Sequence, residues 1–320
     1  MLNHYVLLNY YFEISLWTDY WAYKELRIDY KKTSVMLRLA DFSSREVRLL
    51  PLDTIEAFHI ENEITYCKHI DEGKACLSRT STSRNEYCDI HIDYHPRHTR
   101  CVHKPMCNGE RKNCPDYSIC SSSHILYALL YPTSQLNLEG KIHWIIKIGV
   151  TSIRNGLTRI LSQNPPIALT IAQFPNYWQA LRFEEMLQQK MRIKNAEIRD
   201  KMPAGEKLSL FLSYLRNRDQ KFDEDILEKD IETIKDSILE FLIAKEADKK
   251  CIMLDNKIWL NLNTINEIPP PIERPITHKL FLVSDVLGNI LILEELDTKS
   301  LGALLIGSIL RKKVRIRFLI

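Results

Sequence analysis

Short runs of alternating apolar and polar residues mark both ends of the chain. They cover residues 35–39, 46–50, 279–283, 290–293 and 313–319. A period of two is typical of strands that bury one face. Both ends are therefore predicted to be β-rich, and the similarity of their patterns indicates strands of one shared sheet or barrel.

Two more strands are predicted over residues 123–131 and 144–150, where apolar residues recur at even positions. These positions form one core face and comprise Leu126, Ala128, Leu130, Trp144, Ile146, Ile148 and Val150. The polar exceptions on the opposite face are Tyr127, Tyr131 and Lys147, which a hairpin would bring together. A lysine beside a tyrosine favours the phenolate, whose ordinary pKa of about 10 is too high for base chemistry at neutral pH.

Helices are predicted where the apolar period is 3.6. Over residues 177–191 the apolar side chains that share a narrow arc are Ala180, Phe183, Leu187 and Met191. Glu184 lies at the edge of this arc, whereas Glu185 points away from it. A carboxylate on an inward face needs a partner, which could be a functional cation or metal ion, or simply a neighbouring arginine. Residues 224–247 predict a second amphipathic helix.

The composition narrows the class of protein. The chain has 320 residues, 45% hydrophobic and 27% charged, which excludes a wholly disordered or collagen-like chain and suits two or three domains. The net charge of +3 is too small to indicate a nucleic-acid partner by itself. No apolar run reaches the roughly 18–20 residues of a membrane-spanning helix, and no basic residue precedes Lys24, as a signal peptide would require. We therefore expect a cytoplasmic protein without a membrane partner.

Cysteine is unevenly distributed along the chain. Seven of the eight cysteines lie between Cys67 and Cys120, and Cys251 stands apart. Disulfides would suit a secreted chain or an intracellular protein of a hyperthermophile, whereas a tight cluster without an export signal favours a metal. Two complete tetrahedral zinc sets use all seven cysteines and one histidine. They are Cys67, Cys76, Cys88 and His91 in the first set, and Cys101, Cys107, Cys114 and Cys120 in the second.

The surroundings of the cysteines leave two questions open. Histidines that could replace a cysteine ligand are His69, His95, His98 and His103. Closed four-ligand sites are structural, because a catalytic zinc keeps an open position. Residues 95–112 also carry five Lys or Arg and a single acid, Glu110. Such a patch on a metal-held loop could contact phosphates, or it could be an ordinary solvated loop.

Four short motifs, in order along the chain, carry a resemblance to a known family. They are residues 126–128 (Leu-Tyr-Ala), residues 147–149 (Lys-Ile-Gly), Arg159, and residues 180–184, which end in Glu184. Over residues 122–195 this series resembles the GIY-YIG nuclease superfamily. The wider stretch 60–200 is similar to the uncharacterised domain of unknown function family 2797. In that family a cysteine-rich segment precedes a Tyr-x-Leu strand, a Lys-Val-Gly-Ile-Thr motif and an Arg-Gly-x-x-Arg-x-Leu-x-Gln stretch, comparable here to residues 155–163.

The resemblance implies roles for individual residues. Glu184 would bind one divalent cation, Mg²⁺, and Arg159 would neutralise charge that grows on the phosphate. Tyr127 would help to deprotonate or to position the attacking water. Lys147 stands where most members of the superfamily have a tyrosine, and it could bind phosphate or activate Tyr127. The first motif also lacks the glycine of the superfamily.

Together these patterns predict an α+β multi-domain protein with a small three-stranded antiparallel sheet and helices at its centre. The expected parts are a β-rich domain (1–60), a zinc-binding segment (61–121), a GIY-YIG-like domain (122–200), a helical connector (201–250) and a β-rich C-terminal segment (251–320). The expected function is metal-dependent hydrolysis of phosphodiester bonds in DNA or structured RNA, with two structural zinc ions and no small-molecule cofactor. The alternatives are a non-catalytic protein that binds nucleic acid or ribonucleoprotein with a nuclease-like fold, and a scaffold with purely architectural zinc.

Overall fold

Strands predominate in the computed structural model, which is 48% strand and 27% helix. The structure describes residues 3–13, 24–29, 32–81, 86–91, 120–136, 141–245, 251–261, 269–272 and 276–318. The chain divides into two compact units, and each combines segments that are far apart in the sequence. Unit 1 draws on residues 1–15, 30–100 and 269–320, and unit 2 draws on residues 16–29 and 101–268.

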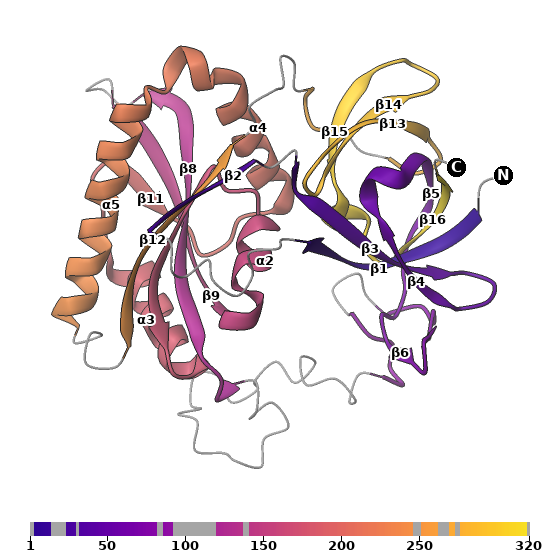
Figure 1. Cartoon of the computed structure of the whole chain (residues 1–320), viewed down its shortest axis with the longest axis horizontal. Helices are drawn as coiled ribbons and strands as arrows, with labels where there is room; N and C mark the ends of the chain where they lie inside the picture. The colour runs from indigo at the N-terminus through magenta and orange to yellow at the C-terminus, as the bar shows by residue number, and fades with distance from the viewer. Residues whose placement is uncertain are drawn as a thin grey trace. The chain divides into compact units, whose positions relative to one another are not determined.

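Unit 1 is built on an eight-stranded sheet in which every neighbouring pair is antiparallel. Its strands, in spatial order, are β15 (Leu301–Leu305), β14 (Ile290–Glu295), β13 (Leu280–Leu287), β5 (Ile55–Thr65), β16 (Lys312–Phe318), β1 (Asn3–Glu13), β3 (Ser34–Asp41) and β4 (Val47–Pro51). Strands β1 and β16 are neighbours, with Asn3 opposite Ile316. The prediction that strands from both ends share one sheet is confirmed, as the indigo and yellow strands of Figure 1 show.

The core of unit 1 mixes side chains from both ends of the sequence. Leu7 and Leu39 from the first strands, and Leu291 and Ile316 from the last, are all buried. They surround a small apolar cavity together with residues of the short 3₁₀ helix η6 (Ile306–Ile309). A second 3₁₀ helix, η3 (Leu52–Thr54), buries Leu52. Because successive strand residues face opposite sides, burying one face still leaves the other for charged groups.

Glu61 on β5 is the centre of a charged cluster in unit 1. Lys313 Nζ and Arg315 Nε, both from β16, lie 2.9 and 2.7 Å from its carboxylate oxygens. The Glu61 side chain is 12% exposed. Burial acts to raise the pKa of Glu61, but hydrogen bonds from Arg315 and Lys313 outweigh it and lower that pKa to about 2. The ionised carboxylate therefore links β5 to β16.

Unit 2 contains a six-stranded sheet, so the predicted small three-stranded sheet is wrong. Its strands, in spatial order, are β11 (Ala196–Ile198), β9 (Ile142–Ser152), β8 (His124–Leu136), β10 (Ile167–Phe174), β12 (Ile252–Asn261) and β2 (Glu25–Asp29). The central three strands pair antiparallel, whereas β11 and β2 join by parallel pairing. Parallel strands are not joined by a tight hairpin, so the sequence contains no turn motif that would indicate the pairing of β11 and β2 with this sheet.

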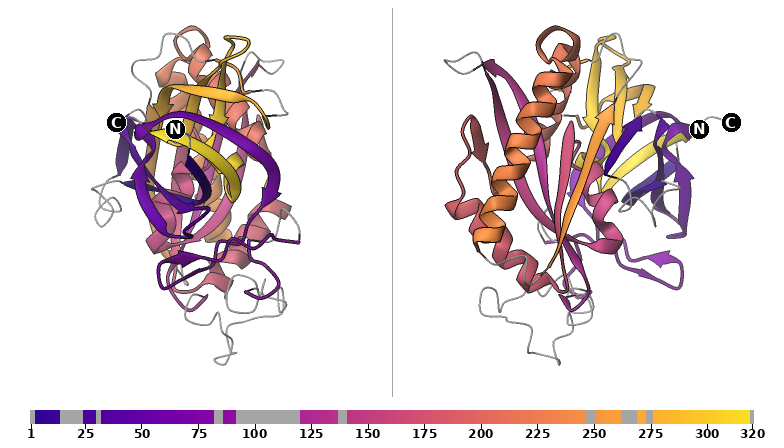
Figure 2. Two further views of the ribbon diagram at one scale, coloured as in Figure 1. Left: turned by 90° about the vertical axis from the view of Figure 1, so that its right-hand side faces the viewer. Right: turned by 60° about the vertical axis from the view of Figure 1, so that its left-hand side comes forward.

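Helices of unit 2 cover both faces of this sheet. They are α2 (Gly156–Leu161), which follows the 3₁₀ helix η5 (Ile153–Asn155), α3 (Tyr177–Lys190), α4 (Ala204–Lys221) and α5 (Glu224–Ala244). Figure 1 and Figure 2 show α3 and α5 on one side of the sheet and α2 on the other. The two helices predicted from the 3.6 period are present as α3 and α5. Each begins at a side-chain cap, where Asn176 and Asp223 accept hydrogen bonds from backbone N–H groups of the first turn.

The main core of unit 2 lies between the sheet and helices α3 and α5. It contains the predicted even-numbered face of β8 and β9 with the apolar stripes of both helices, including Trp144, Phe183 and Ile231. The strands predicted over residues 123–131 and 144–150 are therefore present, and their even-numbered side chains face this core. None of the helices in the described part of the chain combines the length and the apolar character that crossing a membrane requires.

Candidate metal centre and cationic site

The first predicted zinc set begins with a hairpin that directly follows β5. Strands β6 (Ile70–Asp71) and β7 (Lys74–Ala75) are joined by Glu72 and Gly73, which have φ of 45° and 79°. Two consecutive positive φ values are typical of a type I′ turn, whose twist matches antiparallel strands. Cys67 precedes the hairpin and Cys76 follows it. The N–H of Cys76 donates to the carbonyl of His69 at 2.9 Å, so the hairpin brings the two cysteines together.

Cys88 and His91 complete the group from one tight turn. The N–H of His91 donates to the carbonyl of Cys88 at 2.9 Å. A further backbone bond, from Lys68 to Glu86 at 3.1 Å, attaches this turn to the hairpin. The Cys-x2-His spacing thus places a thiol and an imidazole on the same side of the turn.

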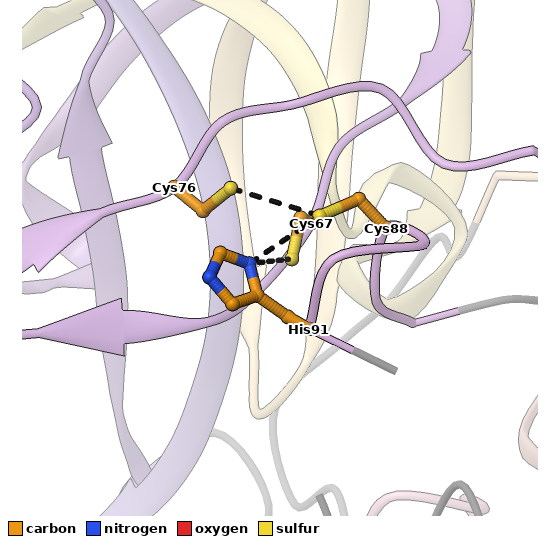
Figure 3. A group of neighbouring side chains, drawn as sticks. All are labelled: Cys67, Cys76, Cys88 and His91. Carbon is orange, nitrogen blue, oxygen red and sulfur yellow. Dashed lines mark hydrogen bonds between the residues drawn. The ribbon is translucent and has the colours of Figure 1, made fainter. Parts of the chain in front are cut away.

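The four side chains have the separations of a tetrahedral zinc site (Figure 3). Sγ of Cys76 lies 3.8 Å from Sγ of Cys88, and Nδ1 of His91 lies 3.6 Å from Sγ of Cys67 and 3.3 Å from Sγ of Cys88. With Zn–S near 2.3 Å and Zn–N near 2.0 Å, an ideal tetrahedron separates two sulfurs by about 3.8 Å and sulfur from nitrogen by about 3.5 Å. The group can hold a metal ion such as zinc.

The pKa values of Cys67, Cys88 and His91 are shifted in different directions. Burial raises the pKa of the Cys67 thiol to about 12. Burial also acts to raise the pKa of Cys88, but hydrogen bonds, the largest from the N–H of His91, outweigh it and lower that pKa. Burial and the neighbouring His69 lower the pKa of His91. A neutral imidazole can coordinate, and a bound cation would displace the thiol protons, because thiolates are the ligand form.

The second predicted zinc set cannot be placed in the same way. Cys101, Cys107 and Cys114 lie outside the described residues, as do His95, His98, His103 and the basic stretch 95–112. Cys120 is described and half-buried. His69, one of the possible alternative ligands, stacks on His91 with 3.9 Å between ring centroids.

In unit 2, Tyr127 and Gly149 are paired across β8 and β9. A Cβ placed on Gly149 would lie 2.5 Å from both Cζ and Oη of Tyr127, so the phenol ring occupies the space that any larger side chain would need. Tyr127 is 2% exposed. The motif of residues 147–149 therefore ends in glycine because the tyrosine of the first motif packs on it.

Gln163, just after α2, holds the hydroxyl group of Tyr127. Its Nε2 donates to Tyr127 Oη at 3.0 Å and to the carbonyl of Arg159 at 3.2 Å. Its Oε1 accepts from Nζ of Lys207, on α4, at 3.1 Å. Its own carbonyl accepts from Oη of Tyr131 at 2.9 Å. Gln163 thus connects β8, α2 and α4.

Three cations act on one another around this tyrosine. Burial, followed by the charges of Lys147 and Arg159, lowers the pKa of Lys207 to about 8. Burial also lowers the pKa of Lys147, with Arg159 adding to the effect and Glu184 and Asp200 opposing it. The effect of Lys147 and Arg159 on Lys207, and of Arg159 on Lys147, shows that positive charge is gathered in a partly buried place. We call the group of Tyr127, Lys147, Arg159, Glu184 and Lys207 the cationic site.

Glu184 supplies the negative charge of the cationic site. It lies on α3, and its Oε1 accepts from Nε2 of Gln188 at 3.3 Å. The same Nε2 is 3.4 Å from the carbonyl of Ile148 on β9, beyond the stretch of β9 that β11 covers. Glu184, rather than Glu185, is the carboxylate that acts on Tyr127 and Lys147. The structure therefore brings together the four residues that sequence reasoning selected.

The electrostatics of Tyr127 differ from the expectation that Lys147 would favour a phenolate. Burial raises the pKa of Tyr127, and this outweighs the charge of Arg159 and the hydrogen bonds from Gln163 and Arg159. The ammonium group of Lys147 instead donates to the carbonyl of Asp200 at 3.1 Å. Because burial outweighs these effects, the phenol keeps its proton, and Tyr127 is neutral at physiological pH.

Sequence reasoning missed Lys207 and gave no role to Gln163. Lys207 stands beside Leu208 and four residues before Phe211, both of which are buried. A lysine next to the apolar stripe of a helix was the available signal. An open pocket close to the carbonyl that Lys147 contacts is lined by Gln188, Gln189, Ile198, Arg199, Asp200 and Lys201.

Comparisons of the chain with protein-family models, with curated proteins and with solved structures find no match.

Proposed function

We propose that unit 2 binds the phosphodiester backbone of DNA or structured RNA at the cationic site and hydrolyses it with the help of a divalent cation. The observation that carries the proposal is the excess of cations: Lys147, Arg159 and Lys207 are accompanied by the carboxylate of Glu184, and only Asp200 adds a further negative charge on Lys147. Their mutual repulsion would be relieved by a bound anion, and a phosphate group accepts charge-assisted hydrogen bonds from such donors.

The donor set is compatible with Mg²⁺. This ion commonly takes one or two protein carboxylates and completes its coordination with substrate phosphate and water. Glu184 would hold the divalent cation, which polarises a phosphodiester oxygen and stabilises the leaving oxygen. The order of the four motifs, and their resemblance to GIY-YIG nucleases, supports the same reading of Glu184.

The chain's own residues would divide the remaining work. In hydrolysis, the oxygen of a water molecule bonds to phosphorus, the bond to the leaving oxygen breaks, and the water proton passes to a base while the leaving oxygen gains a proton. Arg159 would neutralise the charge that grows on the phosphate. Lys147 and Lys207 would add to the positive field. Tyr127, neutral at physiological pH, is better suited to orient the phosphate or the water than to take a proton.

The raised pKa of Tyr127 is the observation that favours the alternative, a binding module without cleavage. Such a protein would use the same cations to hold a nucleic-acid backbone. Glu184 would then offset the charge of Lys147 rather than serve as a metal ligand.

For unit 1 we propose a structural zinc ion on Cys67, Cys76, Cys88 and His91, because all four positions of the tetrahedron are filled by protein ligands. A second structural zinc on Cys101, Cys107, Cys114 and Cys120 remains the companion proposal. The zinc ions would stabilise short loops that have little apolar core of their own.

A panel of DNA and RNA duplexes, single strands and branched structures, assayed with Mg²⁺, Mn²⁺ or EDTA, tests the function. We expect binding in EDTA and cleavage only with a divalent cation. Arg159→Ala should weaken binding. It should also make the binding constant less dependent on salt concentration, by the amount expected for about one phosphate contact. Lys229→Ala, an exposed charge on α5, is the matched control. Binding without cleavage on every substrate would select the binding module, and no binding at all would reject both.

A further inference from the structure

Lys207, near the start of α4, ends a chain of hydrogen bonds that leads to Tyr127. Lys207 Nζ donates to Gln163 Oε1 at 3.1 Å, and Gln163 Nε2 donates to Tyr127 Oη at 3.0 Å. Gln163 and Tyr127 are 3% and 2% exposed, so the chain lies inside unit 2. Lys207 lies outside every motif that carries the family resemblance.

The neighbours of Gln163 fix the orientation of its amide group. An ammonium group only donates, so the atom that faces Lys207 must be the amide oxygen. A peptide carbonyl only accepts, so the atom that faces the carbonyl of Arg159, 3.2 Å away, must be the amide nitrogen. Turning the amide over would break both bonds in a buried place, where unsatisfied polar groups are strongly destabilising.

This orientation decides what the hydroxyl group of Tyr127 can do. Its oxygen accepts hydrogen bonds from Gln163 and Arg159, so its single proton must point to a different acceptor. The charges of Arg159 and Glu184 act on the same hydroxyl group, which places it against the cationic site. The proton is therefore available to an acceptor bound there.

We propose that Lys207 and Gln163 are positioning residues that hold Tyr127 as a hydrogen-bond donor to a phosphate oxygen in the cationic site. The inference rests on the proposed function for its ligand. It goes further in assigning Tyr127 the donor role, and in adding a residue of α4 to the machinery. A ligand that offers an acceptor oxygen at this point is favoured over one that offers a donor.

The first test uses the protein alone. In a chain carrying 3-fluorotyrosine, fluorine NMR follows the ionisation of Tyr127, which Tyr127→Phe assigns. Lys207→Met removes the donor to Gln163 Oε1 and so holds the amide less firmly, which weakens its N–H bond to the phenolate and moves the midpoint of the Tyr127 ionisation to higher pH. Lys207→Arg, which keeps a donor to Gln163 Oε1, should leave the midpoint no higher than that of the wild type.

A second set of variants, made in a Gln163→Leu protein, distinguishes an effect that Lys207 exerts through Gln163 (the relay) from a direct effect of its charge on Tyr127. In Gln163→Leu, which keeps the side-chain volume, Lys207→Met should move the midpoint far less, because the intermediary is gone. An equal shift in both backgrounds would mean that Lys207 acts on Tyr127 through charge alone, which would overturn the relay. Lys229→Met, which removes an exposed lysine, controls for net charge.

The second test measures affinity for oligonucleotides in EDTA. Tyr127→Phe should weaken binding about tenfold, the equivalent of one hydrogen bond to a charged group. Gln163→Leu should weaken it by less, and the double variant should bind no worse than Tyr127→Phe. Additive losses would overturn the inference and leave the proposed function standing. A wild-type chain that binds no nucleic acid would overturn the proposed function and the donor role together.

Discussion

The phenol ring of Tyr127 lies on the Cα of Gly149 in the neighbouring strand. The two residues are directly paired, and a Cβ at position 149 would come within 2.5 Å of the hydroxyl oxygen. The glycine is thus required by space. The ring of Tyr127 packs on the backbone of β9, and this contact keeps its hydroxyl group within hydrogen-bond distance of Gln163.

Gly149→Ala should therefore destabilise unit 2 by about 1–3 kcal/mol, the usual effect of an extra methyl group in a packed core. The displaced ring should also lose its bond from Gln163. Urea unfolding measures the loss. In a Tyr127→Leu background the same substitution should be much better tolerated, since the shorter side chain leaves room. A destabilisation that does not depend on the residue at 127 would contradict the packing argument.

Glu184→Gln should abolish any divalent-cation-dependent cleavage and leave nucleic-acid binding nearly intact. The substituted glutamine cannot bind the metal ion as the carboxylate does, but it fills the same space beside Gln188. All the cations that would contact the phosphate remain in place. Cleavage rates and gel-shift affinities on one substrate decide it. Glu185→Gln is the matched control on the next residue of α3, and equal damage from both variants would show that the assignment of the carboxylate is wrong.

Purified protein, prepared without added metal, should contain two zinc ions per chain by elemental analysis. Cys76→Ser should remove one of them and make the β6–β7 hairpin sensitive to protease, because structural zinc supplies much of the folding energy of such loops. Cys251→Ser, outside both predicted sets, should keep both ions. A zinc-free protein whose thiols titrate as disulfides would be incompatible with the metal centre.

Unit 1 should lose stability in acid because of Glu61. The pKa of this carboxyl group is about 2 in the folded protein against 4.5 for an unperturbed one, so the unfolded chain binds more protons between these values. The stabilisation is present above pH 4.5, disappears as the pH falls through 2, and amounts to about 3 kcal/mol at most. Glu61→Gln should be less stable than wild type at neutral pH, with a difference that shrinks in this window. Glu56→Gln, whose carboxylate is 39% exposed, should show little change.

The features that sequence reasoning predicted correctly have local signals. Alternation over β8 and β9 placed Tyr127 and Lys147 on the face opposite the apolar core. The 3.6 period placed Glu184 on α3, and the Cys-x2-His spacing found a ligand pair that the structure joins to Cys67 and Cys76. Each of these patterns spans only a few residues, and over that length the period of the strand or helix decides which way each side chain points.

The features that were missed depend on contacts between distant segments. The sequences of the central strands could not reveal that β11, β12 and β2 extend their sheet. The hydrophobic pattern of a strand shows which face it buries, but it does not show which strand pairs with its edge. The pKa of Tyr127 follows from burial by elements as remote as α4, whereas sequence reasoning considered only its neighbour Lys147. Lys207 carried a weak signal, one lysine beside an apolar stripe, which is common in solvated helices.

The position of β16 between β5 and β1 has a consequence for biosynthesis. The ribosome releases β1, β3, β4 and β5 well before β16, the strand that joins the two halves of their sheet. All segments of unit 2 precede it, so that unit can complete its own sheet first. Until then the early strands carry open edges, the kind of exposed backbone that recruits other chains. The sheet of unit 1 therefore cannot be completed until all of unit 2 has been synthesised, and the facing edges of β1 and β5 stay exposed for that time.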